Sequence, residues 1–345
     1  MGKLQETPRL QNSGVMSIRE WSAWRKDIAD AGGTLAVVTG TFALLHPGNL
    51  AAIQEATCSS SHVCVIIHPD TPALASTKPT AELGSPVAYQ GTAMPSLAVR
   101  LEMAANLRAV SLATTCLPGD AKAGLARLRP FTLVDCRMQQ SPGIVTTVAR
   151  KLADHIVDLT PIAGCWTAEI QKAIQDGRTP VSVPDAVMAP QPNSHDLDQF
   201  LDTGASGSPL ITVNGCFDVL HLGHMRLLTQ ARNLGARLLV LVNDDDSVRT
   251  YKGAERPIFP IRFRLHALNA LDAVTMAYPF AGDNPLPLLA KIRPDIHVKG
   301  GSFEEARVSA ERQLVESWGG RLETIPLIAG FSTSNVISQM TACPP

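Results

Sequence analysis

The chain has 345 residues, of which 45% are hydrophobic, and its 30 basic side chains nearly balance 31 acidic ones. This balance leaves no overall field that would attract a nucleic acid or an acidic membrane, and no apolar run approaches the ~18 residues of a membrane span. At ~100–200 residues per domain, the length predicts two domains. We therefore expect a globular protein with neither nucleic-acid nor membrane partners.

The N-terminal segment and the cysteines both bear on cellular location. Residues 1–17 lack the apolar core of a secretory signal and predict a flexible tail. The seven cysteines are scattered, and no pair has CxxC spacing. Such cysteines are typical of reduced thiols, and the ligand spacing of a structural zinc site is absent. We expect a cytoplasmic protein.

The first predicted domain covers residues 18–160 and opens on an apolar strand at 35–38. This strand runs into the loop Gly40-TFALLHPGN, and a second apolar strand follows at 62–67. A change from strand to helix periodicity across such a loop is typical of a βαβ unit.

Residues 161–208 differ in composition from the segments on either side. One short helix is expected over 166–175. We interpret the segment as a Pro-rich linker that serves as a spacer. The alternative is that it covers the substrate. Its prolines are Pro161, Pro180, Pro184, Pro190 and Pro192.

The second predicted domain covers residues 209–341 and repeats the plan of the first. A strand at 210–213 enters the loop Gly215-CFDVLHLGH, a helix follows over 222–234, and another strand lies at 237–243. Alternating strands and helices predict parallel sheets with helices on both faces, that is, two Rossmann-like α/β domains in tandem. Ligands in such sheets bind beyond the carboxyl ends of the strands.

Four blocks support an internal duplication, because they occur twice in the same order. The two glycine loops share Gly, Phe, Leu, His and Gly at matching places. The other blocks pair Arg100-LEMAANLRAV with Arg264-LHALNALDAV, Arg127-LRPFTLVD with Lys291-IRPDIHVK, and Gly143-IVTT with Gly330-FSTS.

The chemistry is expected in the second glycine loop. Gly215 lets the chain turn and lets a ligand approach the backbone, and a helix N-terminus follows that favours anions. His221 and His224 are three residues apart, so they share one face of the first helical turn. Two imidazoles there can donate to phosphate oxygens as charge builds up in a transition state. The structural alternative is that these histidines only cap the helix or bind a structural metal.

The loop resembles the GxFDxxHxGH motif of the nucleotidyltransferase superfamily, which includes cytidylyltransferases. HLGH is also similar to the HIGH motif of class I aminoacyl-tRNA synthetases, but no KMSKS-like string follows. Over residues 209–341 the chain closely resembles the transferase domain of the heptose-1-phosphate adenylyltransferase family. The blocks that carry this resemblance are Asn214-GCFDVLHLGH, Val242-NDDDSV, Lys252-GAERPI, Arg264-LHALNALDAV, Val298-KGGSF and Pro326-LIAGFSTSNVI.

This resemblance implies transfer of a nucleoside monophosphate from an NTP to a sugar phosphate. It implies that His221 and His224 stabilise the α-phosphate, that Lys252 neutralises phosphate charge, and that Asp218 orders the loop. A second helix N-terminus is implied at the β- and γ-phosphates. The other implied nucleotide-binding positions are Gly215, Cys216, Phe217, Gly223, Arg264, Lys299, Gly300, Gly301, Ser332, Thr333 and Ser334. Mg²⁺ is expected to accompany the NTP, with no protein ligand to the metal assigned.

Structural alternatives stand beside these roles. In these alternatives, Lys252 is a solvated loop residue and Arg264 pairs with an acid on its helix surface. Ser332 then only caps a helix. Three consecutive carboxylates at 244–246 cannot readily face one ion, so a solvated turn at the strand end is expected there. His266 and His297 read as ordinary helix and strand residues.

The first copy keeps the scaffold of the loop and loses its reactive groups. Ala43 stands where the second copy has Asp218, Asn49 stands for His224, and Asp135 stands for Lys299. The first copy is therefore expected to bind nucleotide poorly or not at all. We expect it to act as a fixed partner, so that the protein forms an internal pseudo-dimer or a homodimer.

Three functions remain open from the sequence. ATP-dependent transfer to heptose 1-phosphate is favoured by the blocks at Lys252 and Val298. A CTP-dependent enzyme would act on glycerol 3-phosphate or on an aminoalcohol phosphate or phosphonate. A nucleotide-binding scaffold without activity is the alternative from a different class.

Overall fold

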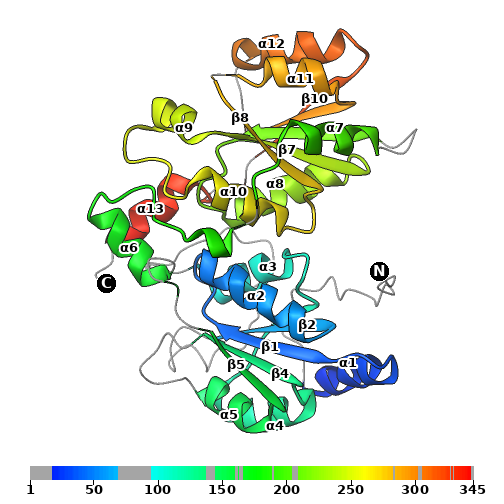
Figure 1. Cartoon of the computed structure of the whole chain (residues 1–345), viewed down its shortest axis with the longest axis vertical. Coiled ribbons are helices and arrows are strands. Elements are labelled where there is room, and N and C mark those ends of the chain that lie inside the picture. The colour runs from blue at the N-terminus through cyan, green and yellow to red at the C-terminus, as the bar shows by residue number, and fades with distance from the viewer. Residues whose placement is uncertain are drawn as a thin grey trace. The chain divides into compact units, whose positions relative to one another are not determined.

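The computed structural model describes residues 18–68, 95–136, 144–159, 162, 166–188, 190–203, 209–282, 284–301, 305–326, 328 and 330–342. The chain divides into two compact units, one within residues 1–162 and one over residues 163–345, with Leu44–Pro47 grouped with the second (Figure 1). The predicted tail, residues 1–17, lies outside the described residues.

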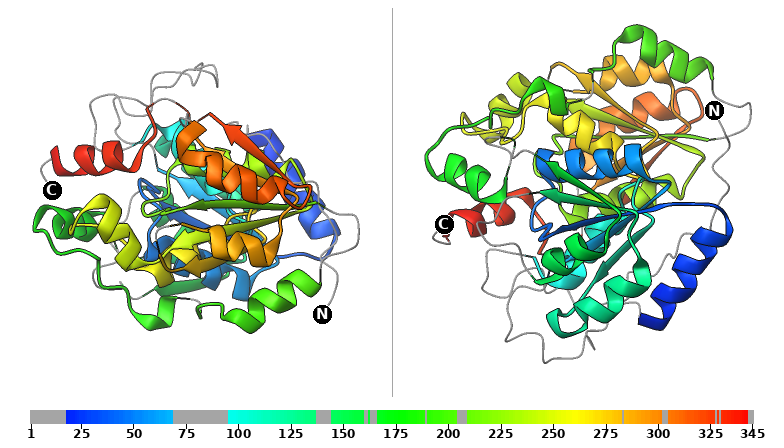
Figure 2. Two further views of the ribbon diagram at one scale, coloured as in Figure 1. Left: turned by 90° about the horizontal axis from the view of Figure 1, so that it is seen from above. Right: turned by 60° about the horizontal axis from the view of Figure 1, so that its bottom comes forward.

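The first unit is built on five parallel strands in the order β3-β2-β1-β4-β5. The strands are β1 (Leu35–Gly40), β2 (His62–Ile67), β3 (Leu112–Thr115), β4 (Thr132–Cys136) and β5 (His155–Leu159). The helices are α1 (Ile18–Asp30), α2 (Pro47–Ser59), α3 (Leu97–Ala105), the 3₁₀ turn η2 (Pro118–Asp120), α4 (Ala121–Leu128) and α5 (Ile144–Leu152). The central strands are buried and mostly apolar because helices cover both faces of a parallel sheet (Figure 2).

The second unit has five parallel strands in the order β10-β9-β6-β7-β8. These are β6 (Leu210–Gly215), β7 (Arg237–Asn243), β8 (Met276–Phe280), β9 (Ile296–Gly300) and β10 (Arg321–Ile325). Its helices are α6 (Thr167–Gln175), the 3₁₀ turn η3 (Asp185–Val187), α7 (Ser194–Asp202), α8 (Leu222–Arg232), α9 (Asp245–Lys252), α10 (Ile261–Asn269), α11 (Leu286–Ile292), α12 (Glu305–Glu316) and α13 (Thr333–Ala342).

The two sheets have the same topology. The second sheet, listed from its other edge, has the order β8-β7-β6-β9-β10. When β1 to β5 are matched with β6 to β10 in chain order, both sheets therefore have the order third, second, first, fourth, fifth strand. The expected fold, two Rossmann-like α/β domains in tandem, is confirmed. In each sheet the chain moves outward through three strands and then returns to the other side of the first, which creates a switch point beside β1 and beside β6.

One block of the repeat was matched wrongly. Gly143-IVTT leads into α5, which lies between β4 and β5, whereas Gly330-FSTS leads into α13, which follows β10. The topological counterpart of α5 is therefore α12. Two similar short strings can both begin a helix without holding equivalent places, because N-terminal turns favour the same small polar residues.

The segment between the copies is more structured than the sequence indicated. It holds two α-helices, α6 and α7, where one short helix was expected, and it groups with the second unit. Leu197 of α7 joins the core cluster of that unit with Leu239 and Phe280. Like α1 before β1, α7 precedes the first strand of its sheet, so the second copy begins before residue 209.

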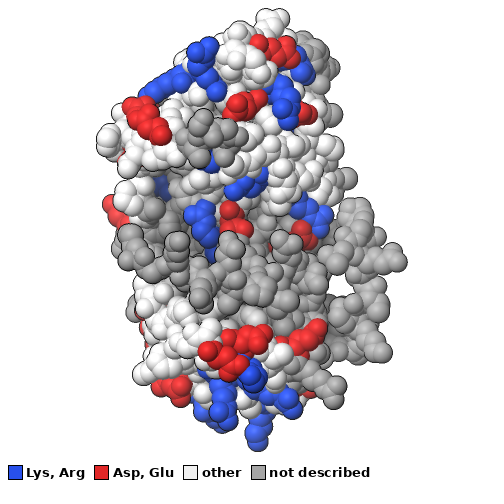
Figure 3. All heavy atoms as spheres, turned by 90° about the vertical axis from the view of Figure 1, so that its right-hand side faces the viewer, with Lys and Arg blue, Asp and Glu red and all other residues white. Residues whose placement is uncertain are grey.

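On the face drawn in Figure 3, basic and acidic side chains lie beside one another. No helix among the described residues is both long and apolar enough to cross a membrane.

Candidate active site

The switch point of the second unit lies between β6 and β9. Register places Val213 beside Val298, so the carboxyl ends of these two strands meet at one edge of the sheet. The loop after β6 and the Lys299–Gly300 end of β9 are both found there. This crevice is where an open parallel sheet binds its ligand.

The backbone of the loop explains its glycine and its phenylalanine. Phe217 has a φ of +46°, and its ring folds back so that a Cβ on Gly215 would lie 3.1 Å from the ring. The first copy repeats this arrangement, with Phe42 at a φ of +50° and a Cβ on Gly40 lying 3.3 Å from its ring. The shared glycine and phenylalanine therefore build the loop, and they do not by themselves indicate chemistry.

His221 is the N-cap of α8. Its Nδ1 accepts the backbone N–H of His224 at 3.3 Å, and burial lowers the pKa of His221 from 6.5 to about 4. A neutral ring that accepts at Nδ1 carries its proton on Nε2, so His221 is a neutral hydrogen-bond donor at that atom.

His224 stacks on His221 in the first turn of the same helix. The ring centroids are 3.8 Å apart with an interplanar angle of 17°, and Phe217 packs edge-on at 5.3 Å. Burial, followed by the neighbouring His221, lowers the pKa of His224 well below 6.5. Its Nδ1 is buried without a hydrogen-bond partner among the described residues, while a backbone hydrogen bond to Val219 acts to raise the pKa of the ring.

A second helix N-terminus meets the first. A Cβ on Gly223 would lie 2.9 Å from the Cβ of Phe331 and 3.0 Å from Nδ1 of His221, so only glycine fits between them. Phe331 precedes α13, where Ser332 accepts the backbone N–H of Asn335 at 3.1 Å. Thr333 and Ser334 form the first turn of this helix. Both N-termini carry partial positive charge, which favours an anion.

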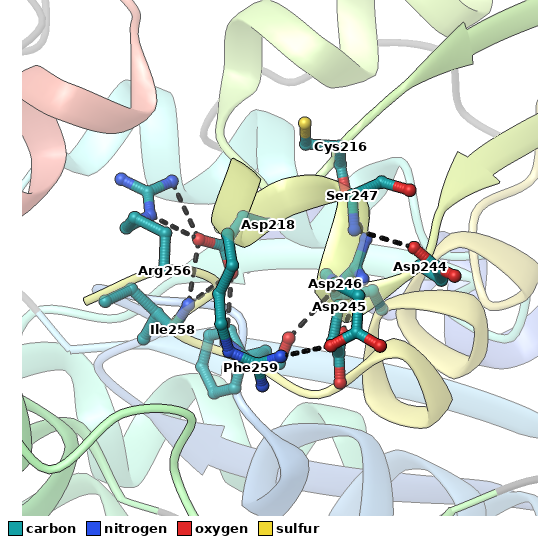
Figure 4. Close-up of polar contacts among 11 residues, drawn as sticks. Cys216, Asp218, Asp244, Asp245, Asp246, Ser247, Arg256, Ile258 and Phe259 are labelled. Carbon is teal, nitrogen blue, oxygen red and sulfur yellow. Dashed lines mark hydrogen bonds and ion pairs between the residues drawn. The ribbon is translucent and has the colours of Figure 1, made fainter. Parts of the chain in front are cut away.

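Asp218 anchors the segment that follows α9 (Figure 4). Its carboxylate accepts the backbone N–H groups of Ile258 at 2.8 Å and Phe259 at 2.9 Å, and it pairs with Arg256 at 2.7 Å. The sequence did not single out Arg256, although it lies in the quoted block after Lys252. The first copy has Ala43 here, which cannot form this anchor.

Arg264 is a buried strut rather than an exposed counter-charge. Its Nε donates to the carbonyl of Phe259 at 3.1 Å, one terminal nitrogen donates to the carbonyl of Cys216 at 2.6 Å, and the other pairs with Asp245 at 2.7 Å. In the first copy Arg100 donates to the carbonyls of Pro95 at 3.1 Å and Thr41 at 2.6 Å.

The strut is therefore common to both copies. The expected alternative for Arg264, a pair with an acid on its own helix, is wrong in one respect, because Asp245 belongs to α9. The residue still contributes positive charge near the loop.

Cys216 lies within the field of three cations. Burial raises the pKa of its thiol, whereas Lys252, Arg264 and Arg256 act to lower it. Lys252 itself is exposed at the end of α9, before Gly253 with a φ of +96°. The structure thus brings the exposed lysine and two arginines close enough to Cys216 to act on its thiol.

Lys299 is paired within the protein. Its Nζ lies 2.8 Å from Oδ1 of Asn214 and 2.7 Å from Oε2 of Glu311. Gly300 ends β9, and Gly301 has a φ of +123°. Neither Asn214 nor Glu311 was identified from the sequence as a contact of this lysine.

The three consecutive aspartates begin helix α9 and do not form a turn, although the side chain of Asp246 is exposed. Asp244 caps α9 by accepting the backbone N–H of Ser247 at 2.8 Å, Asp245 pairs with Arg264, and Asp246 pairs with Arg249 at 2.5 Å (Figure 4). Their carboxylates serve three different partners. In the described part of the chain, no group of three or more His, Cys, Asp or Glu side chains is placed to hold a metal ion.

The fold and the site define an open parallel α/β domain with an HxGH loop at its switch point. Residues 212–338 match the family described as cytidylyltransferase-like. Bifunctional protein HldE of Coxiella burnetii (strain Dugway 5J108-111) is 42% identical over 139 residues, which are 40% of this chain and 29% of that protein. Bifunctional protein HldE of Halorhodospira halophila (strain DSM 244 / SL1) is 37% identical over 195 residues, 56% of this chain and 40% of that protein.

Among solved structures, the lipopolysaccharide core biosynthesis protein from Thermoplasma volcanium GSS1 is 27% identical and matches 35% of this chain and 98% of its own, with a TM-score of 0.31. The present chain spans less than half the length of either HldE protein.

Proposed function

We propose that the second unit is a nucleotidyltransferase that joins the nucleoside monophosphate of ATP to a sugar phosphate such as heptose 1-phosphate and releases pyrophosphate. The observation that carries this proposal is the stacked pair His221 and His224 at the N-terminus of α8, placed at the switch point beside the N-terminus of α13. The HldE relatives of the same region and the six sequence blocks support the choice of ATP and heptose phosphate.

The proposed reaction needs no protein nucleophile. A phosphate oxygen of the acceptor attacks the α-phosphorus of the NTP, and the bond to pyrophosphate breaks. Nε2–H of His221 and the ring of His224 donate to the non-bridging oxygens, where negative charge grows in the transition state. Lys252 neutralises phosphate charge, and the helix N-termini hold the remaining phosphates.

Magnesium enters this proposal as part of the nucleotide substrate. The carboxylates of Asp218, Asp244, Asp245 and Asp246 all have protein partners. The triphosphate oxygens would therefore hold the ion, and its chemistry would be to offset phosphate charge.

The test is pyrophosphate release by the purified chain, with ATP or CTP crossed against heptose 1-phosphate, glycerol 3-phosphate and phosphoethanolamine. We expect turnover with ATP and heptose 1-phosphate. His224→Ala should lower turnover at least about 100-fold, because one donor to the developing charge is lost. The matched variant in the first copy, His46→Ala, should stay within a few-fold of the unchanged protein.

Each other outcome has a definite meaning. Turnover with CTP would keep the mechanism and change the substrate. Loss of turnover in His46→Ala but not in His224→Ala would show that the roles of the copies are reversed. Nucleotide binding without pyrophosphate release across the panel would favour the scaffold.

A further inference from the structure

Five polar side chains cross the switch point on one face of the second sheet. Residues two apart on a strand share a face, and register pairs Thr212 with His297. Hydrogen bonds and one ion pair connect the five residues in two sets, which approach each other at His297 and Glu311 without a hydrogen bond between them. They are Thr212 and Asn214 of β6, His297 and Lys299 of β9, and Glu311 of α12.

The contacts within this switch-point network are close and buried. Lys299 contacts Asn214 and Glu311 as described above, and Nδ1 of His297 lies 2.8 Å from Oγ1 of Thr212. Nε2 of His297 lies 3.6 Å from Oε2 of Glu311. Burial lowers the pKa of His297, so its ring is neutral and the charges of Lys299 and Glu311 balance. A buried charge needs such a partner, because removing it from water unpaired is costly.

The first copy has the same arrangement with opposite charges. Asp135 of β4, the counterpart of Lys299, pairs with Arg150 of α5, the helix equivalent to α12. Thr39, at the place of Asn214, is 2.9 Å from Thr146 of the same helix. The exchange of Lys299 for Asp135 therefore does not leave a free carboxylate, because Asp135 is paired with Arg150. Both copies retain an ion pair between a strand end and a helix.

We propose that Glu311 and His297 are positioning residues of the nucleotide site, which act through Lys299 and Asn214. Glu311 fixes the ammonium of Lys299, and Lys299 fixes the amide of Asn214. Asn214 directly precedes Gly215, so the network sets where the strand ends and the Gly215–His221 loop begins. This inference deepens the proposed function and rests on it for its kinetic part.

The experiment compares Glu311→Gln with the unchanged full-length protein by two readouts. The first is the rate at which iodoacetamide alkylates Cys216, followed at the level of the peptide by mass spectrometry. Cys216 is two residues from Asn214, so loosening of the loop should raise this rate several-fold. The second is the kinetics of pyrophosphate release, where the KM for the nucleotide should rise about tenfold and kcat should change less, since one charge-assisted hydrogen bond is lost.

Two further variants provide a matched control and a second test of the network. Asp135→Asn breaks the equivalent ion pair of the first copy and should leave Cys216 alkylation and KM unchanged. His297→Leu installs the residue found at Leu133 in the first copy and serves if Glu311→Gln does not fold. It should raise both quantities about two- to threefold, as a weaker contact is removed.

The proposal is overturned if the variants of Glu311 and His297 alkylate Cys216 at the unchanged rate and keep the unchanged KM. It is also overturned if Asp135→Asn raises KM as much as Glu311→Gln does. The alkylation readout needs no substrate. If the protein without substitutions releases no pyrophosphate, this result contradicts the proposed function. The alkylation rate of Cys216 in the variants still tests the role of the network.

Discussion

His221 and His224 derive their properties from burial rather than from their place in a motif. A histidine on a helix surface titrates near its ordinary pKa of 6.5, but burial lowers the pKa of His221 to about 4 and that of His224 well below its ordinary value. Both rings are therefore neutral near pH 7 and donate hydrogen bonds without carrying charge. A bound triphosphate would raise the pKa of each ring, because its negative charge favours the protonated form.

We expect nucleotide affinity to rise as the pH falls from about 8 to about 6, with proton uptake on binding, because the phosphate raises a pKa that lies near 4 in the free protein. Titration calorimetry of a non-hydrolysable NTP analogue in two buffers of different ionisation enthalpy measures both. His221→Asn keeps a capping side chain and should reduce the uptake. An affinity independent of pH, without proton uptake, would show that these rings do not meet the phosphates.

At the scale of elements, residues 166–188 form a strap on the second unit. The hydroxyl of Thr179 donates to the carbonyl of Glu255 at 2.8 Å, the N–H of Val181 donates to the carbonyl of Ile258 at 2.7 Å, and Asp185 pairs with Arg262. Helix α6 of the strap packs on α13. The strap thus contacts the segment that Asp218 holds and the helix that supplies the second N-terminus.

Removing the side-chain contacts of the strap should loosen the segment after α9. In the double variant Thr179→Val and Asp185→Ala, we expect the amides of Ile258 and Phe259 to exchange hydrogen faster and the KM for nucleotide to rise by less than about fivefold, since exposed pairs contribute modestly. Hydrogen exchange with mass spectrometry and steady-state kinetics check this. Lys172→Ala removes an exposed pair of α6 and is the control. Unchanged exchange in the double variant would leave the strap as a spacer.

At the scale of the whole molecule, histidines with lowered pKa occur in both units. In each case burial is the largest cause, and the lowered pKa reaches about 3 for His46 in the loop of the first copy. Through these histidines, the free energy of unfolding depends on pH in both units. They are His46, His62, His68, His221, His224, His266 and His297.

We expect the free energy of unfolding to fall as the pH decreases from about 6.5 toward about 4, because the unfolded chain binds protons that the folded rings cannot. A difference of one in pKa corresponds to about 1.4 kcal/mol for a fully buried group. Urea unfolding from about pH 7.5 to about pH 5 measures the slope, which should be smaller in His221→Gln. A free energy that stays constant over this range would contradict the buried, neutral state of these rings.

The sequence by itself indicated the duplication and the parallel α/β fold, and it predicted the place of the candidate site. Local patterns are sufficient for these conclusions, because apolar strands, glycine loops and repeated blocks each lie within about ten residues. The sequence also contained a helix-capping signal that was missed when residues 161–208 were interpreted as a linker. Asn193 and Asp196 form a capping box that opens α7, and the intervening spacing is the usual one for that motif.

The tertiary structure alone decided the partners of the charged residues. Asp218 and Arg256 are 38 residues apart, and Arg264 joins Asp245 from another helix. Lys299 and Glu311 meet because a strand leads into a helix that folds back over it. A sequence shows which charges exist, but burial and distance set whether a charge meets a ligand or a neighbour, and both depend on how the strands are ordered in the sheet.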